Sequence, residues 1–153
     1  MIRTYQDAVT RYGTIVNGVW LSAAGWCDNI DVPEPIYSHL TNAATGKACK
    51  KIYCNKDMVI PLQHVFNDII ASGLCEELKT FDGCFNVRDV RGRPGYPSAH
   101  SYALAIDLNA KMNPLGKWTH MNVDVVSIFE DHGFTWGGRF LRIDGMHFSY
   151  AWE

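Results

Sequence analysis

The stretch 98–109 constrains the fold of this chain most, because it joins a strand pattern to two chemically reactive side chains. From Ala103 onward, small or polar residues alternate with leucine and isoleucine, which is typical of a strand with one face in the core. Asp107 lies on the other face, and His100 precedes the strand in a loop opened by prolines and a glycine. The sequence therefore predicts an imidazole in a loop and a carboxylate on the open face of the strand that follows.

This pair of side chains indicates a metal site. A neutral imidazole and a carboxylate that meet at a cleft are two of the three protein ligands of a catalytic zinc, whose fourth position stays open for water. A candidate for the third ligand lies in segment 144–148, where His147 stands in a short apolar stretch and Asp144 precedes it by three residues.

Length and charge limit the alternatives. The chain has 153 residues, of which 47% are hydrophobic, so it can bury the core of one domain, and we expect a single domain over 1–153. A formal net charge of −2 with interspersed signs gives no basic footprint for nucleic acid. The N-terminal residues lack the pattern of a secretory signal, and no apolar run approaches the ~20 residues that span a bilayer. We therefore expect synthesis in a cytoplasm, no stable membrane association and a monomer.

The five cysteines are Cys27, Cys49, Cys54, Cys75 and Cys84. An odd number cannot all pair within one chain, and a reducing compartment keeps thiols free. We expect compact thiols, buried or partly exposed, rather than ligands or disulfides.

Hydrophobic spacing, caps and turn residues predict the other elements. These are a hairpin that turns at Asn17-Gly18, a core helix over 57–72, a strand over 85–90 after a turn at 81–84, a helix over 123–132 after Asn122, and a strand pair within 143–152. Segment 23–54 is expected to form loops and short pieces. The glycine-rich segment 134–140 predicts backbone that bends sharply or passes close to a site.

The order of these motifs carries a family resemblance. Ser98-x-His100-x6-Asp107, then Trp136-Gly137-Gly138, then Asp144-x-x-His147, with Arg88 upstream, resembles the zinc D-alanyl-D-alanine carboxypeptidase group, which includes VanY-like enzymes and phage L-alanyl-D-glutamate endopeptidases. The resemblance implies a small α+β domain with a central antiparallel sheet and two main helices. The hedgehog signalling domain is similar to the same family.

The resemblance also implies residue roles. One zinc is bound by His100, Asp107 and His147, the general base is Asp144, and an upstream arginine stabilises the polarised carbonyl. Arg88 matches that arginine, although Arg91 and Arg93 stand close by.

Three further residues, Ser98, Tyr102 and Trp136, are candidates for supporting the ligands or forming the substrate wall. Family members commonly have glycine where this chain has Ala103. The alanine would therefore add a methyl group on the cleft face of this chain. They often have glutamate at the position of Asp144. The aspartate makes the general base of this chain one methylene shorter.

These roles predict a zinc peptidase that hydrolyses peptidoglycan stem peptides, with the internal L-Ala–D-Glu bond as the expected target. The expected setting is a phage or prophage lysis enzyme, without a separate wall-binding domain, that reaches the wall through a membrane lesion made by another protein. Loops such as 23–54 are expected to set specificity. The alternatives are a D-Ala-D-Ala carboxypeptidase, a non-catalytic zinc-containing binding module, and a cysteine hydrolase that uses Cys84 and His64.

Overall fold

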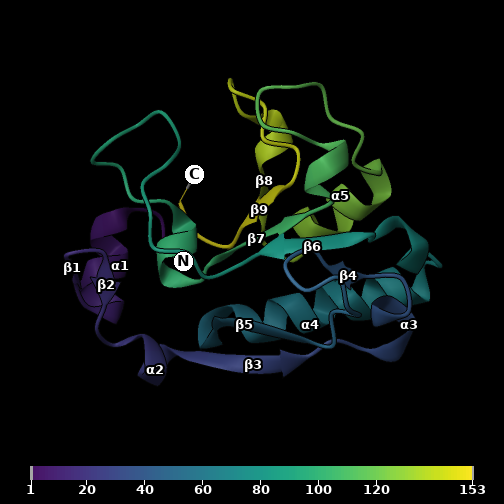
Figure 1. The fold of residues 1–153 in the computed structure, drawn as a ribbon, viewed down its shortest axis with the longest axis horizontal. Coiled ribbons are helices and arrows are strands. Elements are labelled where there is room, and N and C mark those ends of the chain that lie inside the picture. The colour runs from purple at the N-terminus through teal and green to yellow at the C-terminus, as the bar shows by residue number, and fades with distance from the viewer. Residues whose placement is uncertain (1, 153) are drawn as a thin grey trace.

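The computed structural model describes residues 2–152 and forms an α+β fold around a five-stranded sheet of order β4-β6-β7-β9-β8. Met1 and Glu153, the end residues of the predicted domain 1–153, lie outside the described residues. The sheet strands are β4 (Thr41–Asn42), β6 (Thr80–Gly83), β7 (Ala105–Leu108), β8 (Thr135–Trp136) and β9 (His147–Ser149). β4 and β6 run parallel, and the other neighbouring strands are antiparallel (Figure 1).

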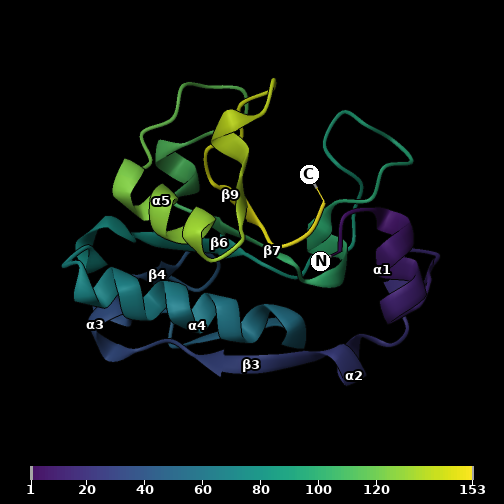
Figure 2. The same ribbon diagram turned by 180° about the vertical axis from the view of Figure 1, so that it is seen from behind.

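Two main helices cover one side of this sheet. They are α4 (Lys56–Ala71) and α5 (Val123–Asp131), which stand in front of the sheet in Figure 2. The Asn122 side chain accepts hydrogen bonds from two backbone N–H groups of the first turn of α5, as a helix N-cap does. Phe129 of α5 stacks on Phe148 of β9 at a ring distance of 4.1 Å, so apolar side chains join helix to sheet. Both predicted helices are confirmed, with ends within one residue of the expectation.

The N-terminal part, residues 5–26, consists of four short elements. It contains α1 (Tyr5–Tyr12), the hairpin β1 (Ile15–Val16) and β2 (Val19–Trp20), and the short helix α2 (Ala23–Trp26). The hairpin turns at Asn17 and Gly18, whose φ angles of 49° and 75° are left-handed, as the Asn-Gly pair predicts.

Segment 23–54 is more regular than expected. It contains β3 (Cys27–Asp31), the short helix α3 (Glu34–Tyr37), β4 and the start of β5 (Lys51–Asn55). β3 and β5 form a two-stranded antiparallel sheet over five residue pairs, which lies along α4. The expectation of loops was wrong here, because strands paired across a long connection leave no local spacing signal.

Two strand predictions also need correction. Segment 81–84, predicted as a turn, belongs mostly to β6, whereas the predicted strand 85–90 has no regular secondary structure apart from one isolated bridge at Asp89. The predicted strand pair within 143–152 is the single strand β9, which pairs with β7 and β8. Both predictions failed because the residues of a short strand are determined by the strand with which it pairs, and the local sequence does not show that partner.

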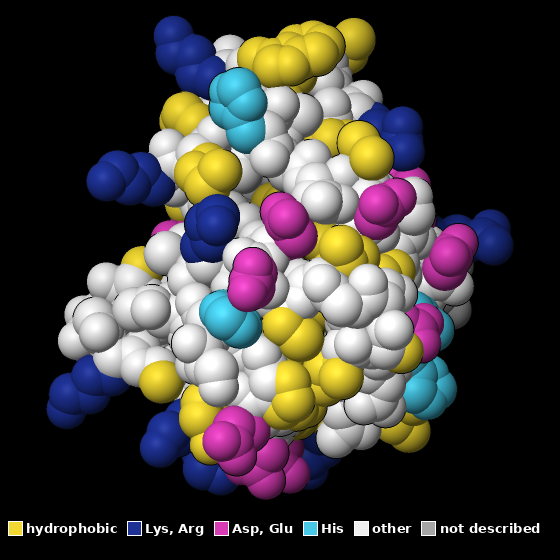
Figure 3. Space-filling model, turned by 90° about the vertical axis from the view of Figure 1, so that its right-hand side faces the viewer, with side chains coloured by type: hydrophobic (Ala, Val, Ile, Leu, Met, Phe, Trp, Pro, Cys, Tyr) yellow, Lys and Arg dark blue, Asp and Glu magenta, His cyan; other side chains and the backbone are white. Residues whose placement is uncertain are grey.

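All five cysteines are free thiols, four of them buried and Cys75 partly exposed. Among residues 2–152, no helix is long and apolar enough to cross a membrane. Acidic and basic side chains are interspersed on the face drawn in Figure 3.

Candidate metal centre

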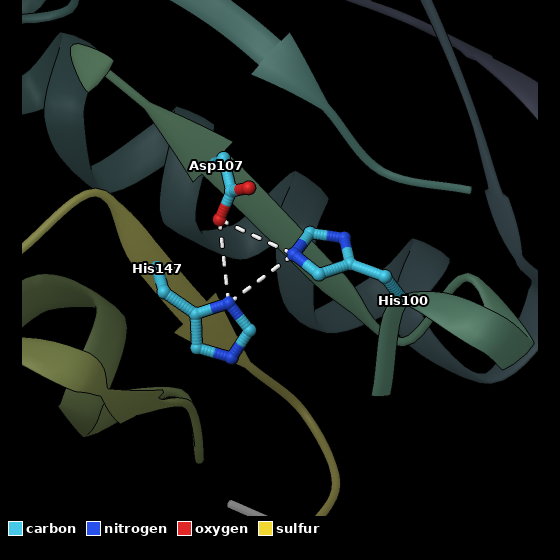
Figure 4. A group of neighbouring side chains, drawn as sticks. All are labelled: His100, Asp107 and His147. Atoms are coloured by element: carbon cyan, nitrogen blue, oxygen red, sulfur yellow. Dashed lines mark hydrogen bonds and ion pairs between the residues drawn. The ribbon is translucent and has the colours of Figure 1, made fainter. Parts of the chain in front are cut away.

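Asp107 and His147 are brought together by strand register. β7 and β9 are antiparallel, and Asp107 lies directly opposite His147. Residues that face each other across an antiparallel pair project from the same side of the sheet. The His147 Nδ1 and Asp107 Oδ1 atoms are accordingly 3.3 Å apart (Figure 4). The neighbouring pair, Ile106 and Phe148, projects from the other side and is buried in the core.

His100 reaches the same point from outside the sheet. It lies in the 3₁₀ helix η2 (Ala99–Tyr102), which begins where the Ser98 hydroxyl accepts a hydrogen bond from the backbone N–H of His100 at 3.4 Å. The His100 Nδ1 atom lies 2.7 Å from the Cys84 carbonyl oxygen. Its Nε2 atom lies 3.2 Å from both Asp107 Oδ1 and His147 Nδ1.

These three atoms fit a zinc ion. Ligands at the ordinary zinc distances of ~2.0–2.2 Å in a tetrahedral site stand about 3.3 Å from one another. The observed separations of 3.2, 3.2 and 3.3 Å form such a triangle. A carbonyl oxygen only accepts hydrogen bonds, so the Cys84 carbonyl keeps the proton of a neutral His100 ring on Nδ1 and turns the Nε2 lone pair toward the triangle. One histidine is placed to ligate through Nε2 and the other through Nδ1.

The electrostatics keep Asp107 ionised. Its burial alone would raise its pKa, but the close His100 and His147 rings outweigh burial and hold the pKa below its ordinary value. Within residues 2–152, His100, Asp107 and His147 are the one group of histidine, cysteine or acidic side chains with metal-ligand geometry.

Asp144 stands beside this group because the chain turns sharply. The backbone N–H of His147 donates to the Asp144 carbonyl at 3.1 Å, and the N–H of Asp144 donates to the Gly137 carbonyl at 2.9 Å. Gly145 permits the bend by lacking a side chain, since a Cβ there would stand 2.5 Å from the Thr119 hydroxyl. Its φ angle is not left-handed, so close approach rather than unusual torsion explains this glycine.

The Asp144 carboxyl is half-buried, and its Oδ1 atom has no hydrogen-bond partner within residues 2–152. Burial raises its pKa above the ordinary value, although the nearby histidines and Arg91 oppose this shift. A carboxylate with a free acceptor and a raised pKa is suited to take up a proton.

A cleft of about 520 Å³ opens over Asp107, Asp144 and His147. Its other walls come from segments 88–98 and 140–146 and from Leu115. Segment 23–54, which was expected to shape specificity, does not line it, because that segment packs along α4. Segments 88–98 and 140–146, which line the cleft, belong to two loops that stand apart in the upper part of Figure 1.

Arg88 lies on the cleft wall and is half-buried, and its backbone is fixed by a residue that the sequence did not single out. The buried Ser101 hydroxyl accepts from the Arg88 N–H at 3.0 Å and donates to the Arg88 carbonyl at 2.8 Å. Ser98 adds a backbone hydrogen bond to the same carbonyl at 3.0 Å. Ser101 therefore ties Arg88 to the short helix that carries His100. No spacing rule connects a serine to a backbone thirteen positions away.

Ser98 lines the cleft, whereas Tyr102 is not among the residues of its wall. Its ring is fully buried among the N-terminal aromatic residues, and its hydroxyl donates to the Gly13 carbonyl at 2.7 Å. Trp136 lies behind the site, where its indole N–H donates to the Gly145 carbonyl at 2.9 Å. Trp136 thus supports the turn that presents Asp144 and forms none of the cleft wall.

Ala103 is buried and lines no part of the cleft, so its methyl group does not narrow the site as expected. Its backbone is left-handed, with φ 53° and ψ 36°. Glycine adopts this left-handed conformation without strain, which explains why glycine is common at this position in the family that the sequence resembles.

The cysteine hydrolase interpretation finds no geometric support. Cys84 is buried and its pKa is raised well above the ordinary value by burial, whereas a nucleophile needs an accessible thiolate. His64 is exposed on α4 and its ring packs against His132.

Comparison with known proteins gave one match. Residues 91–150 match the model of a family described as D-alanyl-D-alanine carboxypeptidase. This segment includes His100, Asp107, Asp144 and His147 but not Arg88. No curated protein and no solved structure matched the chain.

Proposed function

We propose that this chain is a zinc-dependent peptidase that hydrolyses the stem peptide of bacterial peptidoglycan. The observation that carries the proposal is the triangle of His100 Nε2, Asp107 Oδ1 and His147 Nδ1 at 3.2–3.3 Å, two of whose residues, Asp107 and His147, line the cleft. The family match over 91–150 supports a peptidase of the D-alanyl-D-alanine carboxypeptidase type.

The side chains around the triangle have the roles that amide hydrolysis requires. A zinc ion held by these ligands would supply a positive charge for the scissile carbonyl and would lower the pKa of bound water to about 7. Asp144 accepts the proton of the attacking water and passes it to the departing amine. Arg88 donates hydrogen bonds from the cleft wall to the carbonyl oxygen as negative charge develops on it.

We further propose that the bond cut is the L-Ala–D-Glu bond and that the enzyme serves phage or prophage lysis. Cleavage inside the stem peptide detaches cross-links, whereas removal of a terminal D-Ala leaves existing cross-links intact. The second candidate is a D-Ala-D-Ala carboxypeptidase, which the description of the matching family favours.

A non-catalytic zinc module is the remaining alternative. Asp144 and Arg88 both line the cleft, and a module that only binds partners has no use for a half-buried acid with a free acceptor atom. The two side chains therefore favour catalysis.

Hydrolysis of purified peptidoglycan tests the proposal. We expect release of soluble fragments, loss of activity with a chelator and recovery with zinc. Mass spectrometry of the digested muropeptides identifies the bond, and loss of a terminal D-Ala alone would favour the carboxypeptidase. Stoichiometric zinc binding without any hydrolysis would favour the binding module. Efficient Sec-dependent export of the protein by itself would contradict the lysis role.

A further inference from the structure

The cleft beside the candidate metal centre carries more positive charge than the chemistry of hydrolysis explains. Four arginines line it, namely Arg88, Arg91, Arg93 and Arg142. Its acidic lining residues are Asp107 and Asp144, one a candidate ligand and the other the candidate base. The walls around these two acids are therefore basic, although the chain as a whole has a formal net charge of −2.

None of the four cleft arginines forms an ion pair within residues 2–152. Two of the three arginines outside the cleft behave differently. Arg11 pairs with Asp57 at 2.6 Å, and Arg139 pairs with Glu130 at 2.6 Å. Guanidinium groups left unpaired around a cavity attract an anion.

Arg142 is the best placed of these groups. It follows the exposed Leu141 on one side of the cleft and reaches the loop on the other side, where its Nη1 atom donates to the Arg91 carbonyl at 3.1 Å. A Cβ on Gly92 would stand 3.0 Å from the same Nη1 atom, so Gly92 leaves room for the guanidinium. This carbonyl is the one hydrogen-bond partner of the Arg142 side chain within residues 2–152.

A carbonyl is a weak partner for a guanidinium, which presents five N–H donors in a planar fork that matches a carboxylate. A carboxylate entering the cleft would form shorter, charge-assisted hydrogen bonds and replace the Arg91 carbonyl as the partner of Arg142. Arg91 and Arg142 lie on facing loops, so a bound carboxylate would meet positive charge from both walls.

We infer that Arg91 and Arg142 form a carboxylate-binding subsite that selects peptides with a free carboxylate next to the scissile bond. This inference rests on the proposed function and names what the cleft requires of its substrate. A glutamate residue whose chain continues from one carboxyl group keeps the other free. An L-Ala–D-Glu bond therefore places a carboxylate one residue from the reacting carbonyl.

Two peptides that differ in one group test the subsite. The first is a stem peptide with the free carboxylate, and the second has a carboxamide in its place. We expect the wild-type chain to prefer the carboxylate by at least tenfold in kcat/KM. Arg142→Gln and Arg91→Gln should each reduce this ratio to below threefold. Arg3→Gln, which removes the same charge outside the cleft, should leave the ratio unchanged.

The ratio is insensitive to partial misfolding, because any loss of active protein lowers both rates equally. A wild-type chain that does not distinguish the peptides, or a ratio that survives both cleft substitutions, would overturn the inference.

A binding measurement separates this inference from the proposed function. If neither peptide is hydrolysed, the proposed function fails, and calorimetric titration of both peptides then tests the subsite directly. Binding of the carboxylate peptide at least tenfold more tightly, lost in Arg142→Gln but not in Arg3→Gln, would support it. Equal binding of the two peptides would reject it.

Discussion

Gly137 lies against Asp144 so closely that a Cβ on Gly137 would stand 2.4 Å from the Asp144 carbonyl oxygen and 3.2 Å from the His147 Cβ. The backbone of this glycine therefore sets the position of both the candidate base and one candidate ligand. The neighbouring Gly138 has a similar constraint, since a Cβ there would enter the Trp136 ring at 2.2 Å. The glycine pair explains how the 3₁₀ helix η4 (Gly137–Arg139) passes behind the metal centre.

Gly137→Ala should consequently reduce both stability and activity. Forcing a methyl group into this contact should cost about 1–3 kcal/mol, the usual scale of overpacking, and should displace Asp144 from the cleft. Gly25→Ala is the matched control, because a Cβ there meets nothing within 4 Å and its φ is not left-handed. Urea denaturation and hydrolysis rates measure the two effects. Wild-type stability in Gly137→Ala would contradict the described packing.

Zinc binding should depend on both histidines of the triangle. His100→Ala or His147→Ala leaves two ligands and should abolish stoichiometric zinc binding at neutral pH. His64→Ala changes an exposed histidine on α4 and should keep one zinc per chain. Elemental analysis after gel filtration gives the stoichiometry. A His147→Ala protein that retains one tightly bound zinc would refute the ligand assignment.

Local signals in the sequence predicted the helices and the hairpin well. The apolar stripe of α4, the Asn122 cap of α5 and the Asn17-Gly18 turn each depend on residues within a few positions of one another. The strands were predicted less well, because a strand of two to five residues is defined by its partner. Segment 81–90 illustrates this, since Phe81 and Gly83 pair with β7 across a register shift.

The sequence motifs supplied the candidate residues of the site but not its geometry. Alternation placed Asp107 on an open face, but the pairing of Asp107 with His147 depends on a register between strands forty positions apart. The Cys84 carbonyl that orients His100 is a backbone group, and backbone partners carry no residue-type signal. Tyr102 is fully buried, and the sequence could not foretell this because an aromatic residue beside a motif fits a core as well as a substrate wall.

Arg88 and Ser101 should contribute to hydrolysis to different degrees. Arg88→Ala removes the donor to the developing oxyanion and should reduce kcat by about a hundredfold or more. Ser101→Ala leaves the Arg88 N–H without its side-chain acceptor and should cost about 1–3 kcal/mol of stability with a smaller loss of kcat. Ser127→Ala, at an exposed serine that bonds its own helix, is the control. Near-normal kcat in Arg88→Ala would show that another arginine has this role.

Ala103 offers a test of backbone strain close to the site. A left-handed conformation costs an L-residue roughly 1–2 kcal/mol, and glycine avoids that cost. Ala105→Gly in β7 removes an equally buried methyl group from ordinary extended backbone. Ala103→Gly should therefore be more stable than Ala105→Gly by about 1–2 kcal/mol in urea denaturation. Equal stabilities of the two variants would contradict the left-handed conformation.

Asp144 should act on protons and not on the metal. Asp144→Asn keeps the shape of the side chain but cannot accept a proton, so hydrolysis should fall by about a hundredfold or more while zinc stoichiometry stays at one per chain. Because burial raises the pKa of Asp144, the wild-type kcat/KM should fall with decreasing pH through a value above the ordinary carboxyl pKa of about 3.9. Protonation below that pH removes the base, and the variant should lack this acidic limb. Metal analysis and pH–rate profiles on the same preparation decide the matter. If the variant loses its zinc together with its activity, Asp144 is a ligand, and if it keeps both, another group handles the proton.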